Sequence, residues 1–570
     1  MSTKHTRRTF LAQAGLLGLA AAALPGSGRG AENAGKRPNV VLIVTDDQGY
    51  GDLGGHGNPA LETPHLDRLH DESTRLTRFY ASPVCAPTRA SLMTGRWNYR
   101  TGVVDTYLGR AMMHANEVTI AEALANQGYR TGIFGKWHLG DNYPMRPQDQ
   151  GFQETLVHKG GGIGQPSDPP DTGYFDPILE YNGAQKQFKG YCTDIFTDGA
   201  MDFIAADKDQ PFFCYLSTNA PHTPLEIADK YADPYRKQGL HEDTARLYGM
   251  VANLDENLGR LLKHIDNLGL REDTIVVFMT DNGAQRNGQS AIDRYNAGMH
   301  GWKGSVYEGG IHVPCFMRWP GTLEPGQTVT RTAAHIDLFP TLLALCGAAP
   351  PEDVELDGRD LSPLLHDPQG DMPERNLFFQ WHRGDAPEKW KACAVVGQRF
   401  KLVNGKELYD LHNDPHERHD IAAQHPAIVA EMRAAYEQWF DDVSSTRGYA
   451  PPRIYIGTKH ENPVILTRQD WRGSDRAGVR EGWGDKNVGH WLVDIRNAGT
   501  YRVRVDVPED TPGTVTLRAA GVEQSKPLEK GAASVTFEGL ELPAGETEVH
   551  AQLDAEGGPF GARYVVFTKE

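Results

Sequence analysis

Two short acidic segments are the first candidates for chemistry in this sequence. Asp46-Asp47 and Asp281-Asn282 each directly follow a continuous apolar run of the kind that forms a buried strand. Adjacent acidic residues at a strand end are costly unless they are solvated or bind a cation, and carboxylates with an amide suit a hard, oxygen-ligated ion. Neither segment is decisive alone, because Asp281-Asn282-Gly283 is also a good tight-turn sequence.

Cys85 begins the segment Cys85-Ala86-Pro87-Thr88-Arg89, which continues through Ala-Ser-Leu-Met to Thr94-Gly95. A lone cysteine is more often a buried, inert thiol than a nucleophile. The offsets of proline, arginine and Thr-Gly nevertheless resemble the C-x-P-x-R and T-G signature of the type I sulfatases, part of the alkaline phosphatase superfamily. In that family the signature directs oxidation of the cysteine to formylglycine, also called 3-oxoalanine.

Further segments resemble the same family in the same chain order. They are Gly135-Lys136-Trp137-His138-Leu139-Gly140, Ala220-Pro221-His222-Thr223-Pro224, the blocks 301–304 and 308–314, and the region 408–417. The resemblance covers about residues 38–440. One position departs from the family pattern, because His312 stands where relatives carry arginine. We interpret this as a structural or substrate-side variation, since Lys303 of the same block is retained.

The resemblance implies a calcium-dependent site built around an oxidised Cys85. One calcium ion would be held against this residue by Asp46, Asp47, Asp281 and Asn282. The hydrated formylglycine has two hydroxyls, of which one would attack sulfur and the other would later expel sulfate. Arg89 would stabilise the hydrate, Lys136 and Lys303 would bind the sulfuryl oxygens, His222 would protonate the leaving alcohol, and His138 would accept the proton during elimination.

Other polar and aromatic residues near these motifs are candidates only for lining the substrate pocket. Found alone, a loop histidine or lysine is usually a solvated surface group. The pocket candidates are His158, Lys159, His300, Trp302, His382 and Arg383.

The elements that must position these residues alternate between strands and helices. Apolar runs at 39–45, 211–217 and 274–280 are typical of strands buried on both faces of a parallel sheet. Helical patterns at 194–208 and 246–268 precede the second and third runs. The pattern predicts an α/β fold, in which ligands gather at the carboxyl ends of the strands. The resemblance implies an alkaline-phosphatase-like, mixed but largely parallel sheet sandwiched by helices.

The domain organisation follows from these patterns and from a change in composition near residue 442. We expect a catalytic α/β domain at 38–345, a smaller α+β C-terminal subdomain at 346–442, a linker at 443–453 and an all-β sandwich module at 454–570. Short alternating runs separated by turns predict antiparallel pairing in that module. Trp471, Trp483 or Trp491 could bind carbohydrate there, but we favour ordinary packing for them.

The composition restricts the partners. A net charge of -17 argues against nucleic acid or an anionic membrane surface as partners. The same charge is unfavourable for an anionic sulfate ester, so the site must concentrate a metal with Lys, Arg and His groups. No apolar run after residue 24 is long enough to cross a bilayer, and stable membrane insertion is not expected. The six cysteines lack metal-site spacing, and we expect no disulfide framework.

The N-terminal residues 1–31 resemble an export signal. Thr6-Arg7-Arg8-Thr9-Phe10-Leu11 precedes a moderately apolar stretch, as in substrates of the twin-arginine (Tat) translocase. We therefore expect a periplasmic or secreted bacterial protein. Such proteins cross the membrane folded, so a formylglycine-generating enzyme would have to act in the cytoplasm, before Cys85 is buried.

Two alternatives to a sulfatase stay open. A phosphate or phosphonate ester hydrolase of the same superfamily would use similar metal and oxyanion contacts. A non-catalytic protein that binds sulfated glycans would leave Cys85 unmodified. The sulfatase interpretation predicts a sulfated small molecule or, more plausibly, a saccharide as substrate, but no motif identifies the sugar or the position of the sulfate.

Overall fold

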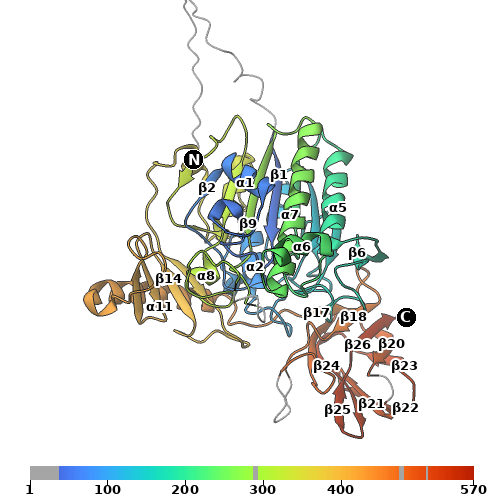
Figure 1. Ribbon diagram of the computed structural model, residues 1–570. Coiled ribbons are helices and arrows are strands. Elements are labelled where there is room, and N and C mark those ends of the chain that lie inside the picture. The colour runs from blue at the N-terminus through green and yellow to red at the C-terminus, as the bar shows by residue number, and fades with distance from the viewer. Residues whose placement is uncertain (1–36, 287–292, 474–480, 509–510) are drawn as a thin grey trace, which may run out of the picture. The chain divides into compact units, whose positions relative to one another are not determined.

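The computed structural model describes residues 37–286, 293–473, 481–508 and 511–570. The predicted export signal lies outside these residues. Figure 1 shows the described elements. In the described ranges, no helix has the length and apolar character needed to cross a membrane. All six cysteines are buried free thiols.

A ten-stranded sheet forms the centre of the structure, with strand order β11-β2-β10-β9-β1-β8-β4-β5-β6-β7. The five strands from β9 to β5 run parallel to one another, whereas β10 is antiparallel to β9 and β2, and β6 is antiparallel to β5 and β7. The strands are β1 (Asn39–Thr45), β2 (Thr74–Leu76), β4 (Arg130–Lys136), β5 (Glu154–His158), β6 (Ile178–Tyr181), β7 (Ala184–Gln187), β8 (Phe212–Ser217), β9 (Thr274–Thr280), β10 (Cys315–Arg318) and β11 (Thr328–Val329).

Helices cover both faces of this sheet. The described α-helices are α1 (Pro64–Asp71), α2 (Cys85–Thr94), α3 (Asn98–Thr101), α4 (Ile120–Ala125), α5 (Cys192–Ala206), α6 (Asp229–Lys237), α7 (Glu242–Asn267), α8 (Glu308–Ile311), α9 (Leu338–Leu345), α10 (Ser362–His366) and α11 (Pro426–Ser445). Of these, α3, α8 and α11 contribute to the core of a smaller sheet that is described below. Helices α5 and α7 correspond to the two predicted helical patterns, and their observed bounds differ from the predicted ones by a few residues.

The alternation of side chains along β1 explains why the strand is apolar throughout. Val40, Leu42 and Val44 contribute to one hydrophobic core, together with residues of α2, α4 and α9. Val41 and Ile43 contribute to a second core with residues of α1, α5 and α7. Successive side chains of a strand point to opposite faces, so a strand covered on both sides needs an unbroken apolar sequence. The predicted mixed α/β fold is confirmed at this level.

A four-stranded antiparallel sheet follows, with the order β13-β14-β15-β16. Its strands are β13 (Leu377–Gln380), β14 (Cys393–Val396), β15 (Phe400–Val403) and β16 (Glu407–Asp410), and its core includes Trp439 of α11. A small parallel pair joins β3 (Phe79–Tyr80) to β12 (Ala333–Ala334). Helix α11 extends to Ser445, so the predicted linker 443–453 begins inside a helix.

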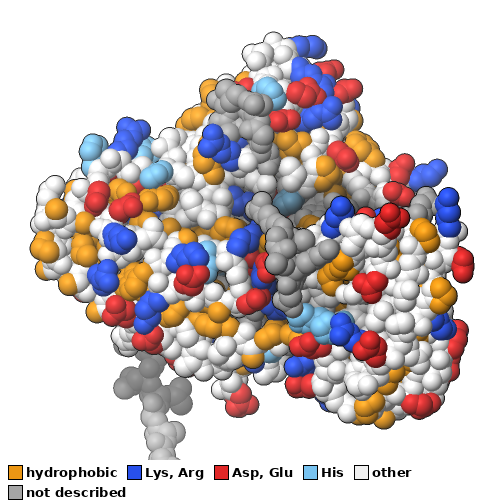
Figure 2. Space-filling model, turned by 90° about the horizontal axis from the view of Figure 1, so that it is seen from below, with side chains coloured by type: hydrophobic (Ala, Val, Ile, Leu, Met, Phe, Trp, Pro, Cys, Tyr) orange, Lys and Arg blue, Asp and Glu red, His pale blue; other side chains and the backbone are white. Residues whose placement is uncertain are grey.

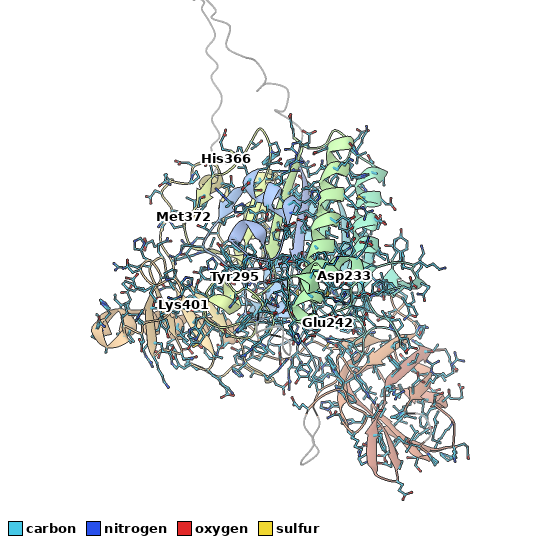
Figure 3. All side chains as sticks on the ribbon, viewed as in Figure 1. Asp233, Glu242, Tyr295, His366, Met372 and Lys401 are labelled. Atoms are coloured by element: carbon cyan, nitrogen blue, oxygen red, sulfur yellow. The ribbon has the colours of Figure 1, made fainter. Side chains whose placement is uncertain are left out.

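Lys401 of β15, labelled in Figure 3, connects this sheet to helix α8. Its ammonium Nζ lies 2.9 Å from Glu308 Oε1 and 2.7 Å from Glu417 Oε1. Glu417 Oε2 accepts a hydrogen bond of 2.7 Å from the backbone N–H of Glu308. We refer to Glu308, Lys401 and Glu417 as the Lys401 cluster. All three residues are buried.

The C-terminal strands form two sheets around a common core. The strands are β17 (Ile454–Ile456), β18 (Val464–Thr467), β19 (His490–Ile495), β20 (Gly499–Asp506), β21 (Gly513–Ala519), β22 (Val522–Leu528), β23 (Ser534–Leu542), β24 (Gly545–Ala555), β25 (Gly558–Gly561) and β26 (Tyr564–Lys569). One sheet has the order β17-β19-β24-β21-β22, with β25 on β24, and the other β18-β26-β20-β23. The expectation of antiparallel pairing alone is wrong for β17, which runs parallel to β19.

The core of this C-terminal module, residues 454–570, is continuous with the catalytic part. Leu108, Met112 and Met145 pack into the same apolar cluster as Trp471 and Trp491. Both tryptophans are fully buried. The preference for packing over carbohydrate binding is therefore correct for these two residues, while Trp483 has a different position that is described below.

Candidate active site

The carboxyl ends of four adjacent parallel strands bring most of the predicted site residues to one edge of the central sheet. Strands β4, β8, β1 and β9 are neighbours in that order. The residues that end or follow them are Lys136 and His138 at β4, His222 after β8, Asp46 and Asp47 after β1, and Asp281 and Asn282 after β9. The polar ends of apolar strands are thus gathered in space, as the α/β pattern predicts.

Cys85 is the first residue of α2, a helix whose residues are all buried. Its Sγ lies within 4.8 Å of carboxylate oxygens of Asp46 and Asp281. Burial raises the pKa of the Cys85 thiol, and Lys136 and Lys303 offset this only in part. An unmodified Cys85 would therefore be a neutral thiol, which is a weak nucleophile.

Arg89 follows Cys85 by one helical turn and binds Asp281 rather than solvent. Its Nη2 and Nε donate to Asp281 Oδ2 at 2.7 and 3.1 Å. Arg89 also donates to the hydroxyl of Ser217 at the end of β8. The guanidinium therefore fixes one oxygen of Asp281 and links helix α2 to strands β8 and β9.

The acidic site cluster consists of Asp46, Asp47, Asp281 and Asn282, all buried. Three of its oxygens, Asp46 Oδ1, Asp47 Oδ2 and Asn282 Oδ1, have no hydrogen-bond partner among the described residues. Burial raises the pKa of Asp46 to about 8, and the neighbouring Asp281 adds to this effect. Buried oxygens without partners are costly, so their presence together indicates a site for a cation. These donors fit a hard ion such as calcium.

Two lysines contact two further oxygens of this cluster. Lys136 Nζ lies 2.7 Å from Asp46 Oδ2, and both side chains are fully buried. Lys303 Nζ lies 2.5 Å from Asp47 Oδ1 and 3.1 Å from Gln285 Oε1. Burial opposes the charge of Lys303, but Asp47 and Cys85 more than compensate and raise its pKa. Although burial also opposes ionisation of Asp47, Lys303 and His222 hold its pKa below the ordinary value.

His138 is held in one tautomer by a backbone carbonyl. Its Nε2 lies 2.7 Å from the carbonyl oxygen of Thr106, which can only accept a hydrogen bond, so Nε2 carries the proton. Its buried Nδ1 has no partner in the described part of the chain. Burial and Lys136 lower the pKa of His138 well below its usual value. The result is a neutral imidazole with a free proton acceptor at Nδ1.

His222 faces the acidic site cluster from the segment after β8. Its Nδ1 is 2.7 Å from the carbonyl oxygen of Thr223, and its Nε2 is 3.7 Å from Asp47 Oδ2. Burial lowers the pKa of His222 to about 4, and Asp47 opposes this shift. The carbonyl places the proton on Nδ1 in the neutral ring, so Nε2 is the nitrogen that exchanges protons beside Asp47.

A cavity of about 520 Å³ opens above these groups. Cys85, His138, His222 and Lys303 contribute to its lining. The loop after β5 approaches closely, because a Cβ added at Gly161 would lie 2.8 Å from His138 Cε1, which only glycine avoids. Figure 2 shows the molecule from below, with Lys, Arg and His side chains around a central hollow. The predicted residues are thus brought together beside a cavity rather than scattered.

Of the six pocket candidates, only Arg383 lines this cavity. Lys159 pairs with Glu180 at 3.2 Å, and the ring of His300 stacks on Tyr307. His312, the departure from the family pattern, also lies outside the lining. Its Nδ1 is 2.9 Å from Glu308 Oε2, so this side chain extends the Lys401 cluster, in agreement with the structural interpretation.

Several cavity residues were not found from the sequence. Thr106, Tyr107, Gln165, Gln285, Arg286 and Trp381 line it, as do Gly482 and Trp483 from the C-terminal module. Most of them lie in irregular loops, where no periodicity indicates which side chain faces a cavity. Trp381 precedes the candidates His382 and Arg383 and could have been chosen with them. The sequence pattern assigns Trp483 to a separate β-module and does not indicate that it reaches this cavity.

Comparisons with known proteins agree with this geometry. A family model described as "Sulfatase" matches residues 38–348, and one described as "N-sulphoglucosamine sulphohydrolase, C-terminal" matches residues 298–441. Human arylsulfatase A is 37% identical over 435 residues, which cover 69% of this chain and 81% of that protein. Mouse N-acetylgalactosamine-6-sulfatase is 34% identical over 378 residues, which cover 62% of this chain and 70% of that protein.

Solved structures show the same relationship. The crystal structure of Ps i-CgsB has a TM-score of 0.64 and 29% sequence identity, and the match covers 75% of this chain and 96% of that one. The order of motifs, the shared architecture and the identity to sulfatases lead to one conclusion. The chain belongs to the sulfatase family of the alkaline phosphatase-like superfamily and is a sulfuric ester hydrolase.

Proposed function

We propose that this enzyme removes sulfate from carbohydrates, using a formylglycine made from Cys85 and one bound calcium ion. The proposal rests on the position of Cys85, which lines the cavity and whose Sγ lies within 4.8 Å of carboxylate oxygens of the acidic site cluster. The similar protein Ps i-CgsB has been solved in complex with k-i-k-neocarrahexaose, which supports a saccharide as substrate. The cavity opens to solvent, as the exposed Arg383 in its lining indicates, so a saccharide chain could extend from it.

The acidic site cluster would hold calcium through the three oxygens that lack partners and through Asp281. A thiol is a poor ligand for this hard ion, whereas an oxidised Cys85 would offer oxygen. When bound, calcium supplies positive charge next to a sulfate oxygen. The formylglycine hydrate supplies a nucleophilic hydroxyl and a second hydroxyl that allows sulfate to leave.

The other site residues bind the substrate and move protons. Lys136 and Lys303 bring two ammonium groups to the cluster and would bind the sulfuryl oxygens. Nε2 of His222 carries no proton in the neutral ring, so it would first take one up beside Asp47, with help from Lys303, and then protonate the leaving alcohol. His138 would accept a proton at its free Nδ1. Arg89, in the second turn of α2, fixes the position of Asp281 through a hydrogen bond. Its guanidinium would also stabilise the hydrate formed at Cys85.

Maturation would require a separate enzyme that acts early. Cys85 is only 2% exposed, so an oxidising enzyme would have to reach it before helix α2 packs. If residues 1–31 direct twin-arginine export, this step would occur in the cytoplasm, and the mature enzyme would act in the periplasm or outside the cell.

The test combines mass analysis with paired substrates. The protein is produced with and without a formylglycine-generating enzyme, and the peptide that contains Cys85 is analysed by mass spectrometry. We expect the aldehyde form in the first preparation and hydrolysis of sulfated saccharides by that preparation alone. An intact thiol in a fully active preparation, or faster hydrolysis of 4-nitrophenyl phosphate than of 4-nitrophenyl sulfate, would contradict the proposal. Cys85→Ala is the matched inactive control.

A further inference from the structure

The outer part of the cavity differs in composition from its inner part. Cys85 and His138 mark its buried inner part, whereas Tyr107, Trp381 and Trp483 are partly exposed and Arg383 is exposed, and we call these four the outer part. The side chain of Arg383 is 52% exposed, compared with 2% for Cys85. A cavity that is polar inside and aromatic near its mouth has more than one place to bind a substrate.

Trp483 is the contribution of the C-terminal module to this cavity. Trp471 and Trp491 are fully buried in the core of that module, but Trp483 is only partly buried and lines the cavity. Its ring meets that of Tyr107 edge to face, with centroids 5.6 Å apart and an interplanar angle of 82°. One aromatic surface is therefore assembled from two separate parts of the chain.

Ion pairs between largely buried arginines and exposed carboxylates connect this surface to the rest of the chain. Arg110, which is 2% exposed, binds both oxygens of Glu481 at 3.1 Å through its Nη2, and its Nε binds Asp385 Oδ1 at 2.7 Å. Arg472 of the module donates to Asp385 Oδ1 at 2.9 Å and to the carbonyl oxygen of Gly109 at 2.8 Å. The carboxylates of Asp385 and Glu481 are 67% and 41% exposed, so each pair contributes modestly to stability, but together the pairs link the segment that carries Trp483 to the buried Arg110.

A second set of contacts orients the cationic side of the outer cavity. The buried carboxylate of Asp105 accepts hydrogen bonds from Trp381 Nε1 at 3.0 Å and Arg383 Nη1 at 2.7 Å. The Arg383 guanidinium lies 4.3 Å from the centre of the Tyr107 ring. Arg286 and Lys303 also line the cavity, while no Asp or Glu is among its described lining residues. The described cavity lining thus carries three cationic side chains, of which Lys303 pairs with Asp47 and Arg383 with Asp105.

We propose that Trp483 and Tyr107 form an outer subsite for the sugar next to the one that loses its sulfate, with Arg383 and Arg286 binding an anionic group on that sugar. The enzyme would then prefer a sulfated oligosaccharide over a monosaccharide. This inference rests on the proposed function, because the inner cavity must bind the reacting sulfate. The C-terminal module is, in this view, part of the substrate-binding site.

A point variant tests the subsite better than removal of the module. Deletion would expose Leu108, Met112 and Met145 and disturb the loop whose Thr106 carbonyl holds His138. Trp483→Ala is therefore compared with the wild type on 4-nitrophenyl sulfate and on sulfated hexasaccharides from carrageenan, chondroitin sulfate and heparin. Trp483→Phe keeps an aromatic ring. Phe175→Ala removes an aromatic side chain that is 47% exposed outside the cavity lining.

We expect kcat/KM of Trp483→Ala on the preferred hexasaccharide to fall about 10- to 100-fold, mainly through KM, and its activity on the aryl sulfate to fall much less. Trp483→Phe should recover most of the loss, and Phe175→Ala should match the wild type. Equal losses on both substrates, or no loss on either, would overturn the proposal.

Binding to inactive protein separates this inference from the proposed function. In the Cys85→Ala background, hexasaccharide affinity is measured by calorimetry with and without Trp483→Ala. The subsite predicts tighter binding of a hexasaccharide than of its sulfated monosaccharide, and loss of that difference in the double variant. Equal affinities for the two ligands would exclude the subsite whatever the catalytic activity. Absence of sulfatase activity with this affinity difference intact would count against the proposed function alone.

Discussion

Two groups of buried carboxylates in this protein use similar residues in different ways. In the Lys401 cluster, one ammonium lies between Glu308 and Glu417, and a backbone N–H and His312 contact further carboxylate oxygens. In the acidic site cluster, Lys136, Lys303 and Arg89 each bind one carboxylate oxygen, and three other oxygens have no hydrogen-bond partner among the described residues. Asp47 Oδ2 has only the ion-pair contact of 3.7 Å with His222, and Asp46 Oδ1 and Asn282 Oδ1 have neither kind of partner there. In the Lys401 cluster, the one oxygen without a hydrogen bond, Glu417 Oε1, lies 2.7 Å from the Lys401 ammonium.

This difference separates a structural charge cluster from a binding site. A buried carboxylate is tolerated when the chain itself supplies the countercharge and the hydrogen bonds. Unpartnered oxygens that converge on one place carry a free-energy cost that binding of a cation can relieve. Burial raises the pKa of Asp46 to about 8, while Lys401, acting against burial, holds the pKa of Glu308 at about 2. Substitutions in the two clusters should therefore have effects of different kinds.

The largest effect is expected for Asp46→Asn. The change removes a negative charge from the acidic site cluster while keeping a side chain of the same shape next to Lys136. We expect calcium binding to weaken strongly and kcat/KM to fall by about 10³-fold, because a metal ion contributes several kcal/mol to charge stabilisation. Calorimetric titration with calcium and steady-state assays measure the two effects.

A surface aspartate provides the control for this prediction. Asp198, whose side chain is 54% exposed and pairs with Arg260, should tolerate the change to Asn with wild-type calcium affinity and activity. Wild-type calcium affinity in Asp46→Asn would remove the cluster from the proposed metal site.

Lys401→Met should act on stability instead. It leaves Glu308 and Glu417 buried without their cation, which costs about 3–5 kcal/mol of folding free energy. We expect a clear decrease in Tm, measured by calorimetry, with calcium affinity unchanged in the folded protein. Lys389→Met is the control, because Lys389 pairs with the exposed Asp441 in the same part of the chain and should change Tm little.

The contact of Lys401 with both Glu308 and Glu417 also predicts that a second substitution can restore part of the lost stability. Adding Glu417→Gln to Lys401→Met removes one of the two unpaired charges and should restore part of the lost Tm. Equal Tm values for Lys401→Met and Lys389→Met would show that the Lys401 cluster does not stabilise the fold as described.

The sequence was most informative where a motif and a strand pattern coincide. The buried run at 39–45 and the polar pair after it predict both the position of Asp46 and Asp47 and their neighbourhood with Asp281, because parallel strands end at the same edge. No strand pattern predicts that Cys85 belongs to the same site. Only the resemblance of its motif to the sulfatase signature does so. Trp483 could not be placed from sequence, since its position depends on ion pairs such as Arg110 with Glu481, 371 residues apart. Such contacts carry no local pattern.

Substitution in a third group of buried carboxylates should have the smallest effect on stability. This group tests whether a proton can replace the cation of the other two clusters. Asp141 and Asp470 lie where the C-terminal module meets the catalytic part, and the Asp141 N–H donates to Asp470 Oδ2 at 3.4 Å. Nearby Lys159 pairs with Glu180 instead. Burial raises the pKa of Asp470 to about 6 and that of Asp141 well above its usual value. Here a proton takes the place that lysine or a metal ion takes in the other clusters.

The sign of the pH dependence follows from these raised pKa values. The folded state holds the proton of Asp470 more tightly than the unfolded state, so its contribution to stability is complete below about pH 4 and is lost as the pH rises through about 6. Asp470→Asn imitates the protonated form. The variant should match the wild type near pH 4 and be more stable at pH 8, by the order of 2 kcal/mol. Calorimetric Tm values at both pH values, with the exposed Asp554→Asn as control, measure this difference, and a Tm gain that is equal at both pH values would contradict it.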